Sequence, residues 1–145
     1  MLIEAIDHIQ ITSSPDVEDA ILFFYSNILG LTEISKPENL KANGGAWYLL
    51  GNIQLHISTE KVTNNETSRR HICFRVRDLN TLKRRLEAHG VEIIPDQNPI
   101  PGWNRFFIRD PGGNRVELAE VILMNHKHLI VHQVNIEKGV ICQSN

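Results

Sequence analysis

The sequence predicts an α+β fold built from two βαβββ modules. Short segments in which apolar and polar residues alternate, typical of half-buried strands, are interrupted twice by a segment whose apolar residues recur every three or four positions, as in a helix that faces a core. The order of these signals in residues 6–58 returns in residues 70–121. The same order found twice in one chain indicates an internal duplication.

The spacing of matching residues supports the duplication. His71 follows His8 by 63 positions, and Glu117 follows Gln54 by the same 63. Equivalent residues of two copies keep a constant offset unless loops differ in length. We therefore expect His8 and His71 to open the two modules, and Gln54 to be the counterpart of Glu117.

The first module begins with a strand over 6–11, in which His8 lies on the polar face. A helix follows. We expect the Ser14 side chain to cap it, Pro15 to suit its first turn and Gly30 to end it. Three further strands are expected at 31–35, 46–50 and 53–58, with a loop at 37–45 and a tight turn at Gly51-Asn52.

The second module repeats this pattern. Residues 71–76 alternate as a strand, and Asp78 is expected to cap a helix that ends before Gly90. Strands are expected at 91–94, 103–109 and 115–121, with a loop at 95–102 and a turn at 110–114.

The bulk composition fits one globular domain. The chain has 145 residues, 41% hydrophobic content and a formal charge of −2. We assign 1–121 to a single domain and 122–145 to a C-terminal extension, and we interpret its His126, His128 and His132 as part of a docked or partly disordered segment rather than as a second metal site.

Several classes of partner and location are disfavoured. Lys and Arg are scattered, so no nucleic-acid or membrane-binding surface is expected, and a small molecule is the expected partner. No secretion signal or long apolar run is present, which predicts a cytoplasmic protein. The two cysteines, Cys73 and Cys142, lie far apart, so no disulfide is expected, and Cys73 is interpreted as a buried thiol in a strand.

The polar faces of the strands carry the residues with chemistry. A strand sends residues i and i+2 to the same side, so His8, His71 and Glu117 each lie opposite an apolar face. Two imidazoles and one carboxylate form a ligand set that suits Fe(II), Zn(II), Mn(II) or Ni(II) and leaves positions for substrate.

These residues resemble the vicinal oxygen chelate superfamily, which includes glyoxalase I, extradiol dioxygenases, fosfomycin-resistance thiol transferases and bleomycin-resistance proteins. The resemblance covers residues 6 to about 120, and its most specific segment is Asp110-Pro-Gly-Gly-Asn-Arg-Val-Glu-Leu118. Further matches are Asp7-His8-Ile9, Phe24-Tyr25 through Leu29-Gly30-Leu31, and His71. It implies a glyoxalase-like half-barrel sheet with the helices on its outer face.

The resemblance also implies a metal site and a chemistry. His8, His71 and Glu117 become ligands of one divalent ion, and either Gln54 or His56 supplies a fourth. The ion would stabilise an enediolate or oxyanion formed from a substrate with vicinal oxygens, with Glu117 or His56 moving the proton. Gln54 departs from the glutamate of many bacterial glyoxalases, which puts strict glyoxalase activity in doubt.

Trp47, Gln54, Trp103 and Arg105 are expected to contact the substrate. The favoured function is a glyoxalase-like lyase or isomerase, and a thiol cosubstrate is left unassigned. The alternatives are an extradiol-type dioxygenase and a non-catalytic, bleomycin-resistance-like binding protein. The resemblance further implies a homodimer, with the site either within one chain or shared between two.

Overall fold

The computed structural model describes residues 1–122, so Cys142 and the three histidines of the extension lie outside the described residues. The described elements follow the predicted order twice. They are β1 (His8–Ser13), η1 (Pro15–Val17), α1 (Glu18–Phe23), η2 (Phe24–Ile28), β2 (Thr32–Ile34), η3 (Glu38–Asn43), β3 (Trp47–Leu50), β4 (Ile53–Thr59), β5 (His71–Arg75), α2 (Leu79–Ala88), β6 (Ile94–Pro95), β7 (Trp103–Arg109) and β8 (Arg115–Val121).

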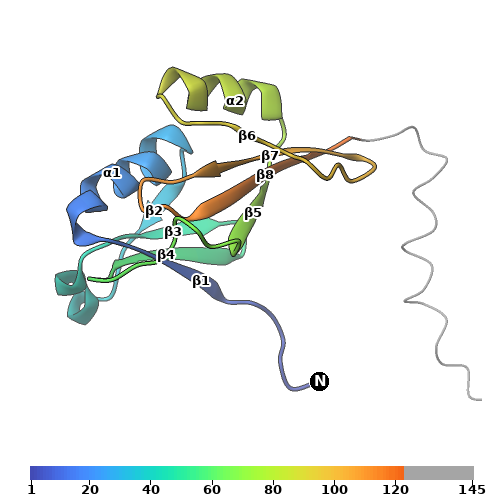
Figure 1. Ribbon diagram of the computed structural model, residues 1–145. Coiled ribbons are helices and arrows are strands. Elements are labelled where there is room, and N and C mark those ends of the chain that lie inside the picture. Colours follow the sequence, from blue (N-terminus) through green and yellow to red (C-terminus); the bar gives the residue numbers. More distant parts are fainter. Residues whose placement is uncertain (123–145) are drawn as a thin grey trace, which may run out of the picture.

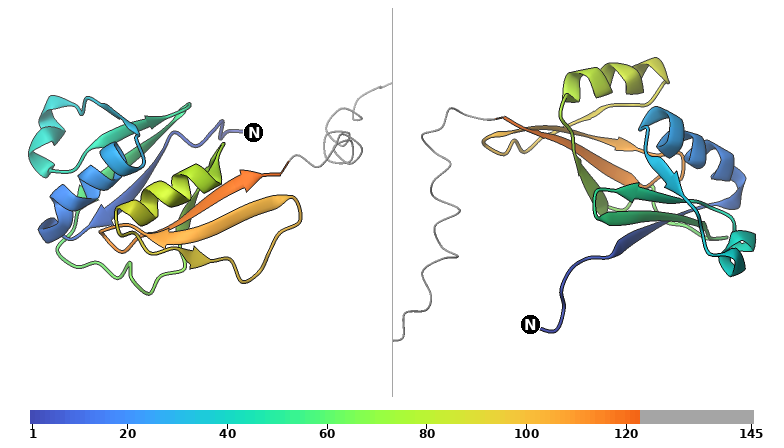
Figure 2. Two further views of the ribbon diagram at one scale, coloured as in Figure 1. Left: turned by 90° about the horizontal axis from the view of Figure 1, so that it is seen from above. Right: turned by 180° about the vertical axis from the view of Figure 1, so that it is seen from behind.

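Each module forms one four-stranded mixed sheet. The strand orders are β1-β4-β3-β2 and β5-β8-β7-β6, and in both sheets the first strand pairs with the last in parallel while the other neighbours are antiparallel. Figures 1 and 2 show the two sheets with α1 and α2 packed against them. The predicted pair of βαβββ modules is confirmed, and β1 and β5 are left as edge strands.

The first helical segment is less regular than the sequence predicts. It starts as a 3-10 turn, continues as α1 and ends as the π-helical η2. The prediction that Ser14 caps it is wrong, because the Ser14 side chain makes no capping hydrogen bond and its hydroxyl instead lies 3.5 Å from the Asp16 carboxylate. Pro15 does occupy the first turn.

The second helical segment, α2, agrees better with the prediction from the sequence. Asp78 accepts a hydrogen bond from the Thr81 backbone N–H, as predicted. The strand expected at 91–94 is wrong in extent, because β6 holds only Ile94 and Pro95. The Val91 N–H bonds to the Leu86 carbonyl at the helix end, which takes it out of a strand ladder.

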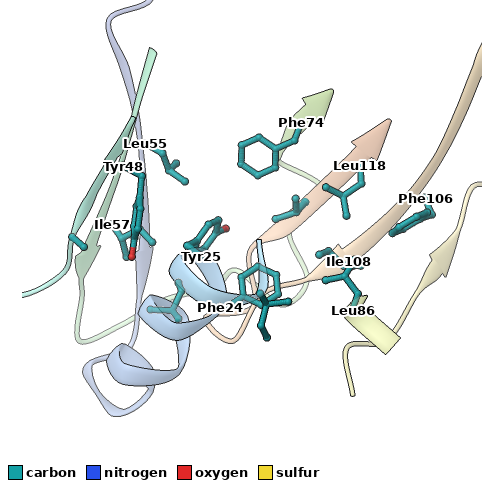
Figure 3. Close-up of a cluster of buried hydrophobic side chains, with 14 of the residues drawn as sticks. Phe24, Tyr25, Tyr48, Leu55, Ile57, Phe74, Leu86, Phe106, Ile108 and Leu118 are labelled. Atoms are coloured by element: carbon teal, nitrogen blue, oxygen red, sulfur yellow. The ribbon is translucent and has the colours of Figure 1, made fainter. Parts of the chain in front are cut away.

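The apolar faces of both sheets share one core. Figure 3 shows Phe24 and Tyr25 lying between side chains of the first sheet, such as Leu55, and side chains of the second sheet, such as Leu118. The Tyr25 hydroxyl donates to the Asp110 carboxylate at 2.9 Å, so a buried hydrogen bond ties the first helical segment to the end of β7. The polar faces of the strands therefore point away from this core.

No helix within residues 1–122 is long and apolar enough to cross a membrane.

Candidate active site

The first sheet gathers ligand-type side chains on β1 and β4. The rings of His8 and His56 stack with centroids 4.3 Å apart, and Trp47 from β3 stacks on the other side of His56 at 3.9 Å. His56 Nε2 lies 2.9 Å from Gln54 Oε1. His56 is 6% exposed, so this ring is held from both faces and at its edge.

The second sheet gathers an equivalent cluster on β5 and β8. His71 Nε2 lies 3.0 Å from Glu117 Oε2, and Glu117 is only 7% exposed. Arg105 donates to Glu117 Oε1 at 3.0 Å and to Asp96 at 2.7 Å, so two carboxylates share one guanidinium. The carboxylate of Glu117 is thus fixed on one side by Arg105 and faces His71 on the other.

The two predicted ligand histidines are oriented in the same way. His8 Nδ1 lies 2.9 Å from Asp7 Oδ2, and His71 Nδ1 lies 3.0 Å from the Arg69 carbonyl oxygen. Both oxygens accept only, so Nδ1 carries the proton and Nε2 is the nitrogen left to bind a ligand. Metal-binding histidines are commonly oriented through this kind of contact.

The structure corrects the predicted counterpart of Glu117. In the parallel ladders Cys73 pairs with Glu117, and Gln10, which lies 63 positions before Cys73, pairs with His56 rather than Gln54. The chain between β1 and β4 is therefore two residues longer than the chain between β5 and β8, so the offset of 63 that relates β1 to β5 does not relate β4 to β8. By register, His56 is the counterpart of Glu117, and the pairs His8/His56 and His71/Glu117 occupy equivalent places.

The pKa of His56 is lowered from its ordinary value of 6.5, mainly because burial disfavours the charged ring and also because His8 lies beside it. A neutral imidazole retains a lone pair at neutral pH. This is the state that a metal ligand or a proton acceptor requires.

The two clusters do not merge within one chain. Among residues 1–122, no group of three or more His, Cys, Asp or Glu side chains lies close enough together to hold a metal ion. His8 and His56 belong to one sheet, and His71 and Glu117 to the other.

His71 and Glu117 nevertheless have the spacing of two ligands of one divalent ion. Donor atoms bound to one ion at about 2.0–2.2 Å lie roughly 3 Å apart, which is close to the 3.0 Å between His71 Nε2 and Glu117 Oε2. With the proton of His71 on Nδ1, these two atoms are both acceptors, and a divalent ion bound to both would satisfy them. The first sheet also holds two ligand-type side chains, His8 and His56, whose rings are stacked. Each sheet alone has fewer than the three or four ligands that a metal site uses.

The predicted substrate residues have different surroundings. Trp47 and Gln54 both contact His56, whereas Trp103 is 39% exposed at the start of β7. Arg105 has most of its donors engaged with Asp96, Glu117 and the Asn98 carbonyl oxygen. A role in substrate contact stays a prediction for these residues.

Cys73 is exposed, so its interpretation as a buried thiol is wrong. It lies on the polar face of β5, next to Glu117. Although the residue as a whole is exposed, partial desolvation of its thiol and the neighbouring Glu117 carboxylate raise the pKa of Cys73 to about 11. The thiol is therefore protonated and a weak nucleophile at neutral pH.

Sequence reasoning missed Asp7 as the partner of His8 and Asp96 as the partner of Arg105. Asp7 stands next to His8 in the chain, so adjacency was an available signal. Asp96 lies in a loop, where no periodicity relates it to β7.

The sequence of the chain is similar to that of proteins in one known superfamily. A sequence profile of the Glyoxalase/Bleomycin resistance protein/Dioxygenase superfamily matches residues 5–118. The Arabidopsis thaliana protein named Glyoxylase I 4 is 26% identical over 110 residues, which is 70% of this chain. The chain spans 63% of the length of that relative.

Solved structures share the fold. A glyoxalase family protein from Bacillus anthracis is 37% identical and has a TM-score of 0.75 over 83% of this chain and 98% of its own. The fosfomycin resistance protein FosX from Listeria monocytogenes is 20% identical, with a TM-score of 0.68 over 84% of this chain and 94% of its own. At that lower identity the likeness concerns the fold alone.

Proposed function

The chain belongs to the Glyoxalase/Bleomycin resistance protein/Dioxygenase superfamily, and on this basis we propose that it is a divalent-metal-dependent, glyoxalase-like enzyme that acts as a homodimer. Its substrate is a small molecule with two neighbouring oxygen atoms. The favoured reaction class is that of a lyase or isomerase.

One observation carries the proposal. Two pairs of ligand-type side chains, His8/His56 and His71/Glu117, occupy equivalent positions on the polar faces of two sheets, and both predicted ligand histidines are oriented through Nδ1. We propose that His8 and His56 of one chain and His71 and Glu117 of a second complete one site. Two equivalent sites then form per dimer, as two-fold symmetry requires.

The choice of His56 over Gln54 as the fourth ligand follows from register and chemistry. His56 stands where Glu117 stands in the other module, and a neutral imidazole is a stronger ligand than an amide oxygen. Gln54 then serves to hold the His56 ring through its contact at 2.9 Å.

Glu117, Arg105 and Asp96 have separate roles in the proposed site. Bound in the site, a divalent ion supplies a positive charge that makes neighbouring substrate oxygens better able to carry negative charge. Arg105 donates to Glu117 Oε1. The other oxygen, Oε2, then remains either to bind the ion or to accept a proton from the substrate. Asp96 positions Arg105 for this contact and so keeps the carboxylate in one orientation.

The test is the metal content of untagged protein, purified without chelators, for wild type and for the variants His8→Ala, His56→Ala, His71→Ala and Glu117→Ala. Near-stoichiometric metal in wild type, lost in each variant that keeps its circular dichroism spectrum, supports the site. α-Keto aldehydes with thiols are then the first substrates to assay. Gln54→Ala tests the choice of fourth ligand and is expected to retain metal, because Gln54 contacts the His56 ring but does not itself bind the ion in this proposal.

The opposite result would be equally clear. A wild-type protein that stays empty after incubation with Fe(II), Zn(II), Mn(II) and Ni(II) removes the enzyme proposal and leaves a small-molecule binding protein as the better account.

A further inference from the structure

Phe107 is an apolar side chain on the polar face of β7. It pairs directly with Glu117 of β8, and side chains paired in this way point to the same side of a sheet. Its exposed fraction is only 7%, although it lies outside the core that the two sheets share. Side chains of the polar face must therefore cover its ring.

Three charged or polar side chains surround the Phe107 ring. The Cζ atom of Arg115 lies over the ring, 4.1 Å from its centroid, and that of Arg105 lies at 5.6 Å. The His71 ring stands perpendicular to the Phe107 ring, with centroids 5.8 Å apart. An aromatic face attracts a guanidinium and holds its plane in one orientation. Phe107 therefore places the Arg115 guanidinium close to His71, one of the proposed metal ligands.

This face of the second sheet borders a cavity of about 720 Å³, here called the β8 cavity. A cavity of this volume suits a small molecule. Its charged lining residues, apart from His71, are Arg69, Arg105, Arg109, Arg115, Glu66, Asp96 and Glu117. Four arginines thus outnumber three carboxylates, and a bound divalent ion would add further positive charge. The β8 cavity therefore favours an anionic ligand.

Two of the arginines already have partners for their N–H groups. Arg105 donates to two carboxylates and one carbonyl oxygen, as described above. Arg109 donates to three backbone carbonyl oxygens, those of Asn65, Ser68 and Gly113. These contacts hold Glu117 and the chain before β5 in place, so neither guanidinium is the best candidate to bind a ligand.

Arg115 differs from both. Its side chain is half-buried, its Nε is buried without a hydrogen-bond partner, and it forms no salt bridge with any carboxylate in residues 1–122. Removing part of a charged group from water costs free energy unless an opposite charge compensates. An anion in the β8 cavity would supply that compensation.

We propose that Arg115 binds a carboxylate group of the substrate beside the metal site. This inference rests on the proposed function and narrows its substrate class to small oxo or hydroxy acids, whose carboxylate lies a few bonds from the two neighbouring oxygens. The planar guanidinium matches a carboxylate through two parallel hydrogen bonds. Arg115 then selects acids over neutral molecules and orients them, while the neighbouring oxygens face His71 and Glu117.

A matched pair of metal-binding probes tests this role. Acetohydroxamate binds a divalent ion through two neighbouring oxygens, and succinate monohydroxamate offers the same two oxygens together with a carboxylate. The dissociation constants of both are measured by isothermal titration calorimetry with zinc-loaded wild-type protein at neutral pH. We expect the carboxylate probe to bind roughly ten to a hundred times more tightly, as a charged hydrogen-bonded contact would. Homologues one methylene shorter and longer scan the reach of the carboxylate.

Variants assign this preference to Arg115. Arg115→Gln should lower the ratio of the two dissociation constants by roughly tenfold or more. Because the preference is a ratio, an effect of the substitution on the metal site itself cancels. Arg115→Lys keeps the charge but loses the planar fork, and we expect an intermediate ratio. Arg77→Gln removes the same charge at an exposed position outside the lining of the β8 cavity, and it should leave the ratio unchanged.

The outcomes separate this inference from the proposed function. Elemental analysis first reports the zinc content of each protein. Zinc-loaded wild type that binds the two probes equally, or a preference that Arg115→Gln retains, overturns the role of Arg115 and leaves the metal site intact. A wild type that takes up no zinc or other divalent ion removes the proposed function and this assignment with it. A preference that Arg115→Gln loses and Arg77→Gln keeps supports both.

Discussion

Tyr25 links distant parts of the chain through a single hydroxyl. It is fully buried, donates to Asp110 and contacts Tyr48 with ring centroids 6.2 Å apart. Asp110 also accepts hydrogen bonds from the backbone and side chain of Asn114. The segment around Asp110, which carries the strongest family resemblance, therefore acts at this residue as a structural connection between the helix and the second sheet.

The environment of the tyrosines predicts a pH dependence. Burial first, and then the Asp110 charge, raises the pKa of Tyr25 well above 10.0, and burial also raises that of Tyr48. A raised pKa in the folded state means that the protonated phenols stabilise the fold fully below pH 10 and that this contribution is lost as pH rises further. Phenolate absorbance should therefore appear only above pH 10 and in two steps: Tyr48 ionises first because its shift is the smaller one, and Tyr25 ionises as the protein unfolds.

The control is the same titration in urea, where both phenols should ionise near the ordinary value. In Tyr25→Phe only the ionisation step of Tyr48 should remain. Ionisation of both tyrosines near pH 10 in the folded protein would contradict the account.

At the scale of elements, the β3–β4 hairpin decides which side chains reach the site. The register of β4 against β1 places His56 beside Gln10, and β3 brings Trp47 opposite His56. That register depends on the close approach of the segment before β3 to β4, where the Ile57 N–H bonds to the Ala46 carbonyl at 2.8 Å. A shift of the hairpin by one residue would turn His56 to the opposite face.

Gly45→Ala is expected to disrupt this close contact between the segment before β3 and β4. Gly45 has φ +69°, and a Cβ there would lie 1.9 Å from the Ile57 carbonyl oxygen. We expect a loss of several kcal/mol in unfolding free energy, measured with urea, which exceeds the roughly 1–2 kcal/mol of a left-handed alanine alone. Gly51→Ala is the matched control, because Gly51 has φ +65° and open space around it. Equal losses in the two variants would contradict the proposed close contact.

At the scale of the whole molecule, the duplicated modules carry two separate pairs of ligand-type side chains, one on each sheet. The two modules share a core through their apolar faces, and that packing leaves each polar face with its own pair of ligand-type residues. In the proposed dimer, a second chain supplies what each face lacks. The proposed dimer is therefore a condition for the chemistry.

A mixed dimer tests this condition. Two chains carrying different affinity tags, one with His8→Ala and the other with His71→Ala, are co-expressed and the heterodimer is isolated. In a shared arrangement one site has all four native ligands and the other lacks both histidines, so metal content should be about half that of wild type. A site within a single chain would leave both chains deficient and the heterodimer empty.

Epitope tags replace polyhistidine in that experiment, because a polyhistidine tag would itself bind metal. Each homodimer, purified alone, serves as the control and should bind no metal. Restored metal in the heterodimer would also require that the variant chains exchange freely during folding, which the yield of doubly tagged protein reports.

The local sequence by itself determined the order of the elements and the faces of the strands. Period-two alternation placed His8, His71 and Glu117 on polar strand faces, and β7 and β8 have the predicted bounds, because side-chain direction in a strand is set by the backbone. Asp78 caps its helix as predicted, since that interaction spans only three residues. These features depend on neighbours in the chain.

The tertiary structure decided the features that depend on residues far apart in the sequence. Loop lengths set the register that made His56, and not Gln54, the counterpart of Glu117. The neighbours of Cys73 decided its exposure, and the loop before β7 brought Asp96 to Arg105. The division of the ligand-type residues between two sheets followed from how the apolar faces pack, a three-dimensional result that alternation along one strand does not contain.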